Sequence, residues 1–102
     1  MRAVFSDAAV EDLESIERYI LSYRDEPFLE RFEEGLAALV RSIAERPWSR
    51  PVYQFPPGAE PKMEYRSANT YNYKVFYRVD EPSDTVIVYR ILHVRSDFTR
   101  VF

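Results

Sequence analysis

The stretch YNYKVFYRVDEPSDTVIVYRILHV, residues 71–94, decides the fold. Residues 71–80 are rich in aromatic and β-branched side chains and alternate between polar and apolar positions, which is typical of a half-buried strand. The segment EPSD at 81–84 predicts a turn. Residues 85–94 form a nearly continuous apolar run, typical of a strand that is covered on both faces. The two runs and their turn predict an antiparallel hairpin.

The alternation sorts the side chains of residues 71–80 onto two faces of a sheet. One face, which we expect to meet a helical layer, carries Tyr73, Val75, Tyr77 and Val79. The opposite face, which we call the far face, carries Asn72, Lys74, Phe76 and Arg78. A tight turn pairs residue 80 with 85, 76 with 89 and 72 with 93, and this register predicts Tyr89 and His93 on the far face as well.

The segments before the hairpin supply further elements. Residues 62–66 alternate polar and apolar side chains and predict another strand. Residues 48–61 are rich in proline and predict an irregular connecting loop. We expect three aromatic side chains to pin this loop to the core: Trp48, Tyr53 and Phe55. Residues 2–5 are apolar and predict a short edge strand.

Two amphipathic helices are predicted between residues 6 and 46. Ser6 or Asp7 can cap the first. Its apolar residues recur at spacings of three and four: Ala9, Leu13, Ile16, Ile20 and Tyr23. Pro27 suits the first turn of the second helix, which ends before Pro47, and Gly35 in its middle indicates close packing between helices.

The order of these elements defines the fold class. A short link at residues 23–27 makes the two helices antiparallel, and each needs another surface to cover its apolar stripe. The chain is therefore predicted to be a single α+β domain, residues 1–102, in the order β-α-α-β-β-β. The two helices pack on a curved, mainly antiparallel sheet.

Composition restricts the classes of function. Hydrophobic residues make up 46% and charged residues 30% of the chain, which is typical of a globular protein. No apolar stretch approaches the roughly 20 residues of a membrane helix, and the N-terminus lacks the apolar centre of a signal peptide. The absence of cysteine excludes disulfides and thiolate chemistry. We therefore expect a cytoplasmic protein without membrane contact.

The net charge of −3 is unevenly distributed. Residues 1–50 carry seven Lys/Arg and eleven Asp/Glu, whereas residues 51–102 carry seven and six. A generic nucleic-acid binder is usually more basic, so we expect any anion-binding site to be local and to lie in the second half.

The second half contains the candidate functional residues. Cations interleaved with aromatic side chains suit contact with phosphates and stacking on bases. The candidates for contact with a target or with phosphate are Lys62, Arg66, Lys74, Arg78, Arg95 and Arg100. The structural alternative is a solvated sheet face whose charges keep an edge from pairing.

His93, the only histidine, is the one side chain with an ordinary pKa near neutrality. Its ring can act in chemistry or close the last strand by a hydrogen bond to a carbonyl of the following loop. The chain offers no spacing of metal ligands, no glycine-rich phosphate loop and no nucleophile elbow, so we expect neither a metal nor a cofactor.

Two segments, AVEDLESIERYI (9–20) and YRSANTYNYKVFYRVDEPSDTVIVYRILHVRSD (65–97), resemble the ParE/RelE superfamily of toxins from bacterial type II toxin–antitoxin modules. Members are also known as plasmid stabilisation proteins. The resemblance covers almost the whole chain. It implies a growth-inhibiting toxin that a cognate antitoxin neutralises by wrapping its C-terminal segment around it. Whether the chain forms homo-oligomers, or hetero-oligomers with the antitoxin, stays open.

The superfamily implies two activities. RelE-like members cleave mRNA in the ribosomal A site with Lys and Arg residues and, in many, a C-terminal Tyr, whereas ParE-like members inhibit DNA gyrase. By position, Arg66, Lys74 and Arg95 match basic residues of the superfamily. Together with His93, Lys74 and Arg95 are the catalytic candidates if the chain is a nuclease.

Two departures favour the ParE-like activity. Glu64 stands where a RelE-like nuclease has a second Lys, and the tail TRVF (99–102) offers no Tyr or His. The resemblance therefore favours a toxin that binds a target such as DNA gyrase. The alternatives are a ribosome-dependent mRNA endonuclease without a metal and a non-toxic member that serves only as the antitoxin's partner.

Overall fold

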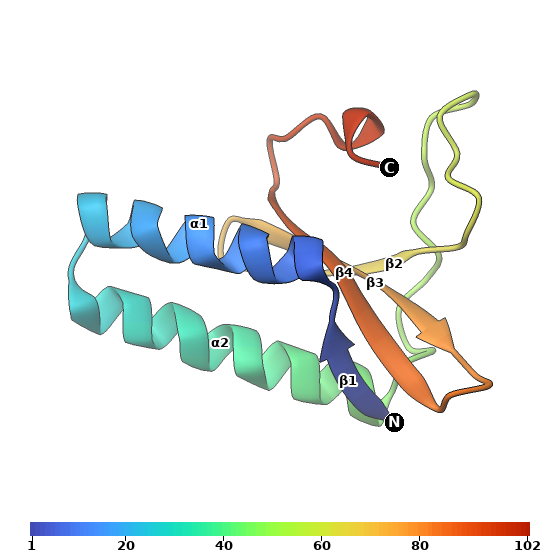
Figure 1. Ribbon diagram of the computed structural model, residues 1–102, viewed down its shortest axis with the longest axis horizontal. Helices are drawn as coiled ribbons and strands as arrows, with labels where there is room; N and C mark the ends of the chain where they lie inside the picture. The colour runs from blue at the N-terminus through green and yellow to red at the C-terminus, as the bar shows by residue number, and fades with distance from the viewer.

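A computed structural model describes all 102 residues (Figure 1). Its elements follow one another as β1 (Arg2–Phe5), α1 (Asp7–Tyr23), α2 (Glu26–Glu45), β2 (Arg66–Thr70), β3 (Tyr73–Asp80), β4 (Thr85–His93) and the 3-10 helix η1 (Phe98–Arg100). The α+β class and the predicted β-α-α-β-β-β order are confirmed. No helix combines the length and the apolar character needed to cross a lipid bilayer.

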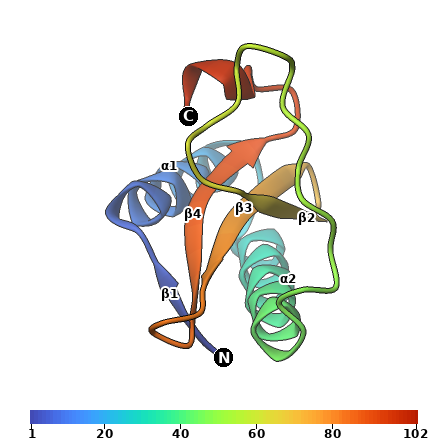
Figure 2. The same cartoon turned by 90° about the vertical axis from the view of Figure 1, so that its right-hand side faces the viewer.

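The four strands form one sheet in the order β1-β4-β3-β2. β1 runs parallel to β4, while the other two pairings are antiparallel, so the prediction of a mainly antiparallel sheet is confirmed. The helices lie antiparallel against one face, and the loop between α2 and β2 passes over the other face together with the C-terminal segment (Figures 1 and 2).

The helix boundaries follow from local hydrogen bonding. The Ser6 hydroxyl accepts a hydrogen bond from the Ala9 N–H at 3.0 Å and caps α1. Asp25 caps α2 in the same way through the Phe28 N–H, with Pro27 in the first turn as predicted. Within the predicted stripe of α1, Ala9, Ile16 and Ile20 are buried and Leu13 is half-buried, whereas Tyr23 at the end of the helix is 72% exposed.

The main core lies between the helices and the sheet. Twelve buried residues form it: Ala9, Ile16, Ile20, Phe32, Leu36, Ile43, Ala68, Val75, Tyr77, Val86, Val88 and Ile91. Tyr73 and Val79 pack against it. The predicted helix-facing side of strand 73–80 is therefore confirmed, as is the assignment of Phe76 to the far face, where it lies in a second cluster.

Gly35 packs against the sheet and not, as we predicted, against the other helix. A Cβ atom at this position would lie 3.2 Å from the Thr70 hydroxyl oxygen and 3.2 Å from the Tyr71 ring. α2 therefore approaches the β2–β3 turn closely, and a larger residue would force this turn to shift.

The prediction of a strand at residues 62–66 is wrong except for Arg66. β2 spans 66–70, and the two-residue turn Tyr71–Asn72, with Tyr71 at a φ of 52°, pairs Thr70 with Tyr73. The sequence RSANT lacks the usual strand-forming residues, so pairing with β3 and contact with α2 determine this strand. Residues 62–65 form the end of the loop.

The predicted β3–β4 register is correct only near the turn. Asp80 pairs with Thr85 as expected, but the register shifts between Phe76 and Tyr77, and from there Phe76 pairs with Arg90 and Tyr73 with His93. Tyr89 is the extra residue of this β-bulge. The predicted pairs 76–89 and 72–93 are therefore wrong, and every side chain beyond residue 89 changes face relative to the expectation.

Candidate functional site

The β-bulge moves His93 to the helix-facing side of the sheet. Its ring packs edge-on against Tyr73, with 5.6 Å between the ring centroids, and its Nδ1 accepts a hydrogen bond from the Arg95 N–H at 3.1 Å. The prediction that His93 shares a face with Lys74 is wrong. The contacts support the structural interpretation, in which the ring closes β4 and fixes the start of the tail, although the partner is an N–H group.

Lys74 lies on the far face, as predicted. Its Nζ donates to the Asn69 Oδ1 at 3.0 Å and lies 5.7 Å from the centre of the Tyr53 ring. His93 pairs with Tyr73, and Tyr73 and Lys74 are successive residues of β3 whose side chains point to opposite faces. Lys74 and His93 are therefore separated by the sheet.

Arg66 lies apart from Lys74. It pairs with Tyr77 in the β2–β3 ladder, which places it on the helix-facing side. Its guanidinium donates to the Arg50 carbonyl and lies 5.1 Å from the Trp48 ring. Trp48 is 52% exposed, so the prediction that it pins the loop to the core is wrong.

The four other cations take separate positions. Arg78 projects from the far face near Tyr65. Burial and the neighbouring Tyr89 raise the pKa of Tyr65, and the positive charge of Arg78 offsets only part of this rise. Lys62 and Arg95 are exposed. Arg100 is also exposed and forms an ion pair with Asp97, with 3.3 Å between Nε and Oδ2. The structure thus divides the six candidates between the two faces of the sheet, the loop before β2 and the segment after β4. Their contact with phosphate or a target stays a prediction.

The far face is covered, contrary to our expectation of an open surface. Phe76, fully buried, lies at its centre with Tyr65 and Leu92. The loop contributes Tyr53 and Phe55, as predicted, and the C-terminal segment contributes Phe98, Val101 and Phe102. We call this group the far-face cluster.

Phe102 anchors the chain end to the far-face cluster. Its ring lies 4.9 Å from that of Phe76, 5.0 Å from that of Phe55 and 4.8 Å from that of Tyr65. Contacts of this kind between aromatic rings stabilise a packed cluster beyond the burial of their area. The tail therefore occupies the space where a substrate of a far-face nuclease would lie.

An ion pair that the sequence did not reveal connects α1 to the bulge. The Asp12 carboxylate accepts two hydrogen bonds from Arg90, at 2.7 and 2.8 Å, and a third from the Ile91 N–H at 3.0 Å. Asp12 looked like one more acid on the solvated face of the helix. The bulge, which exposes a strand N–H, and the adjacent helix create its role.

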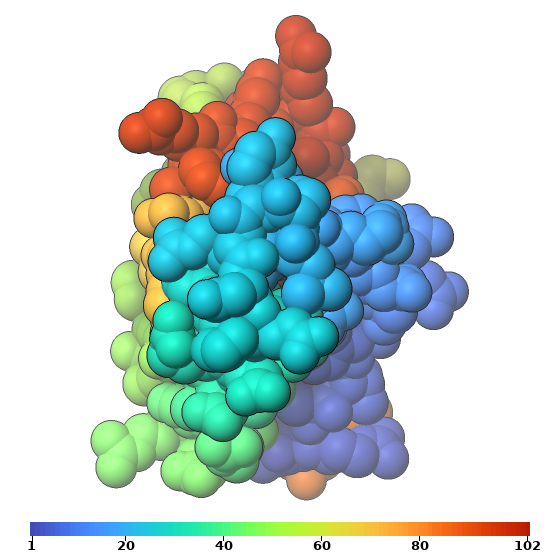
Figure 3. All heavy atoms as spheres, turned by 90° about the vertical axis from the view of Figure 1, so that its left-hand side faces the viewer, coloured from blue at the N-terminus to red at the C-terminus, as the bar shows by residue number.

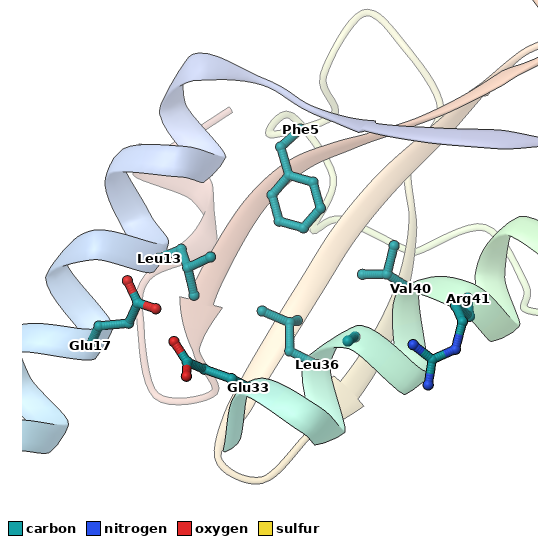
Figure 4. Close-up of a pocket in the computed structure, with 8 residues that line it drawn as sticks. Phe5, Leu13, Glu17, Glu33, Leu36, Val40 and Arg41 are labelled. Atoms are coloured by element: carbon teal, nitrogen blue, oxygen red, sulfur yellow. The ribbon is translucent and has the colours of Figure 1, made fainter. Parts of the chain in front are cut away.

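The two helices form a groove on the helix-facing side (Figure 4). Its pocket has a volume of about 390 Å³ and is lined by Phe5, Leu13, Glu17, Glu33, Leu36, Ala37, Val40 and Arg41. The carboxyl groups of Glu17 and Glu33 point toward each other from α1 and α2, and Arg41 lies at the other end (Figure 4).

The carboxyl pair changes the protonation of Glu17. A hydrogen bond with Glu33, partial burial and the negative charges of Glu33 and Glu14 raise the pKa of Glu17 to about 7. The chain's two ion pairs are Asp12–Arg90 and Asp97–Arg100, so no cation of the chain neutralises Glu17 and Glu33. Nowhere do three His, Asp or Glu side chains gather in a way that could hold a metal ion.

Comparisons with known proteins agree with this architecture. The family model described as ParE toxin of type II toxin-antitoxin system, parDE, matches residues 3–98. The solved structure titled "Chromosomal ParDE TA system from P. aeruginosa" is similar over 91% of this chain and 95% of that chain, with a TM-score of 0.70 and 14% sequence identity. At this identity the structure shows the fold alone. No curated protein matches.

The protein thus shares its fold, two helices on a four-stranded sheet, with a chain of a ParDE system. The family match over nearly the whole chain then identifies it: the chain belongs to the ParE toxin family of type II toxin–antitoxin systems. The resemblance stated from the sequence is confirmed.

Proposed function

We propose that the protein arrests growth by binding a cellular target, with DNA gyrase as the first candidate, and that a cognate antitoxin holds it inactive. The observation that carries this proposal is the separation of the candidate catalytic groups. His93, the only candidate base, lies on the helix-facing side, whereas Lys74 lies on the far face. Metal-free RNA cleavage needs a base and cations at the same phosphate.

The covered far face supports the same proposal. Phe98 and Phe102 fill the surface beside Lys74 and Arg78, and residues 96–102 provide no titratable side chain other than Asp97 and Arg100. Asp97 is held ionised, because hydrogen bonds from Thr99 lower the pKa of its carboxyl group. A ribosome-dependent nuclease would have to rebuild this face when it meets its substrate.

We further propose that the groove between α1 and α2 receives the antitoxin. An apolar groove beside exposed helical surface suits an amphipathic helix. The edge of β2 beyond Arg66, where the bridge to Val52 ends, suits an added strand. The protein expressed alone should then associate with itself, whereas co-expression with the product of the adjacent toxin–antitoxin gene should yield a stable complex. A monomer that stays indifferent to that product would contradict this proposal.

Two assays with purified protein test the target. We expect the protein to inhibit DNA supercoiling by gyrase, to lose this effect when mixed with the antitoxin, and to leave mRNA intact on programmed ribosomes. Cleavage of that mRNA with normal supercoiling would replace gyrase binding by the nuclease alternative. If the protein affects neither supercoiling nor mRNA, and cells that accumulate it in folded form grow at the normal rate, the alternative of a non-toxic antitoxin partner would be favoured.

A further inference from the structure

The pocket between α1 and α2 combines an apolar floor with charges at its two ends. Leu13, Leu36 and Val40 present aliphatic surface, and Phe5 of β1 closes the pocket (Figure 4). An aliphatic side chain of a partner would be removed from water here, which contributes about 25 cal/mol for each Å² buried. The pocket alone does not distinguish one apolar partner from another, so the charges around it carry the specificity.

The end formed by Glu17 and Glu33 calls for a cation. Two carboxyl groups that face each other across a groove cannot both ionise without repulsion, and they resolve it by holding a proton or by binding a positive charge. The chain supplies no such charge, since its ion pairs lie elsewhere. The surroundings are also acidic, because residues 1–45 carry eleven Asp/Glu and only five Lys/Arg.

We propose that an amphipathic helix of the antitoxin places an aliphatic side chain in this pocket and a lysine or arginine between Glu17 and Glu33. The proposal rests on the proposed function, in which the antitoxin occupies the groove. It adds which kinds of side chain the antitoxin must present and that Glu17 and Glu33 bind the positive charge.

The opposite end of the pocket fixes the direction of the bound helix. Arg41 follows Glu33 by eight residues on α2, which corresponds to about 12 Å along the helix axis. A partner helix that lies along α2 therefore presents an acidic residue to Arg41 roughly two turns from its basic residue, with the aliphatic side chain between them. A helix bound in the reverse direction would bring like charges together at both ends.

The same geometry links binding to protons. The groups that face Glu17 are Glu14 on its own helix and Glu33 on α2, while Arg41 lies at the far end and β1 contributes only Phe5. With a pKa of about 7, Glu17 is largely protonated at pH 6 and largely ionised at pH 8. Binding of a cation requires the ionised form, so affinity should fall by up to about tenfold from pH 8 to pH 6.

The experiment measures the affinity of the purified antitoxin, encoded by the adjacent gene, for the toxin and three variants at pH 6 and pH 8. Glu17→Gln and Glu33→Gln should each weaken binding about tenfold at pH 8, and Glu17→Gln should abolish the pH dependence. Glu34→Gln is the matched control, because Glu34 is an exposed acid beside Glu33 that does not line the pocket. It should bind like the wild type.

A charge exchange gives a positive result that a merely structural role would not. Glu17→Lys should lose binding, and an antitoxin whose groove-bound basic residue is changed to Glu should restore it. Binding by Glu17→Gln that equals the wild type at both pH values would overturn this inference while leaving the groove as the docking site. A wild-type toxin that does not bind the antitoxin at all would instead overturn the proposed function.

Discussion

The two faces of the sheet are covered by different means, and the comparison explains how the groove that we propose for the antitoxin arises. On the helix-facing side, two regular helices cover the sheet (Figure 1). Side chains of both helices and Phe5 line a groove between the helices (Figure 4). On the far face, an irregular loop and the chain end pass over the sheet (Figure 2). The rings of Phe55 and Phe102 from these segments pack against Phe76 in the far-face cluster.

The largest expected effect comes from the centre of the far face. Phe76→Ala removes a fully buried ring that contacts the loop and the tail, so it should lower the free energy of unfolding by about 3–5 kcal/mol. Urea denaturation measures this loss. Phe32→Ala in the main core should cost a similar amount. A much smaller loss for Phe76→Ala would show that the far-face cluster is loosely packed and that the face is in effect open.

The next largest effect concerns the ion pair between Asp12 of α1 and Arg90 of β4. Asp12→Ala leaves the Arg90 guanidinium and the Ile91 N–H without their acceptor at a site where the Asp12 side chain is only 13% exposed. We expect a loss of about 2–3 kcal/mol in the free energy of unfolding. Glu11→Ala, an exposed neighbour on the same helix, is the control and should unfold like the wild type. Equal behaviour of the two variants would contradict the role assigned to Asp12.

A smaller effect is expected at His93. His93→Ala removes the acceptor of the Arg95 N–H and the contact with Tyr73, at a cost of about 1 kcal/mol. Growth arrest should fall only in proportion to the folded protein, because no bond chemistry depends on the ring. A thermal melt paired with a growth assay checks this. A variant that melts like the wild type yet loses all toxicity would show that His93 takes part in a chemical reaction.

The smallest effect concerns the acidic pair. The pKa of Glu17 is about 7 in the folded protein and near 4.5 in the unfolded chain, so the folded state binds more protons between these values. Stability should therefore fall as pH rises from about 4.5 to 7. Glu17→Gln should stabilise the toxin by a few tenths of a kcal/mol at pH 8, where solvent screens the repulsion, and should have no effect at pH 4. Urea denaturation at both pH values measures this; equal shifts at both would refute the repulsion.

The sequence was sufficient for the main layers of the fold because their signals are local. Helical periodicity, the cap at Ser6, Pro27 in the first turn of α2 and the alternation of residues 73–80 each depend on a few neighbouring residues. β2 could not be predicted, since its residues have low strand propensity and its position follows from the turn at Tyr71 and from contact with α2.

The candidate site was harder to predict because one inserted residue changes it. The bulge at Tyr89 leaves no mark in an apolar run, yet it moves His93 across the sheet and creates the role of Asp12. The carboxyl pair was hidden for a different reason. Glu17 lies on α1 and Glu33 on α2, and only the packing of these two helices brings the carboxyl groups together (Figure 4).

The exposed surface also differs between the two ends of the helical layer. Figure 3 views the molecule from the end where α1 is joined to α2. Residues near this connection lie in front, and the C-terminal segment lies above them (Figure 3). Tyr19 and Tyr23, at the end of α1, are 57% and 72% exposed, and their rings lie 4.7 Å apart. The groove lies nearer the opposite end of the layer, where Phe5 closes it.

The central claim is that the groove on the helix-facing side binds the antitoxin and that growth arrest does not require it. Ala37→Glu tests this claim most directly, because Ala37 is exposed, lines the pocket and can accept a longer side chain without disturbing the core. Ala38→Glu places the same charge on the next, exposed position outside the pocket and serves as the control.

The measurement is growth of cells that express each variant with and without the antitoxin. We predict that Ala37→Glu arrests growth in both cases, whereas the wild type and Ala38→Glu are rescued by the antitoxin. Rescue of Ala37→Glu by the antitoxin, or loss of its toxicity while folded protein accumulates, would contradict the account.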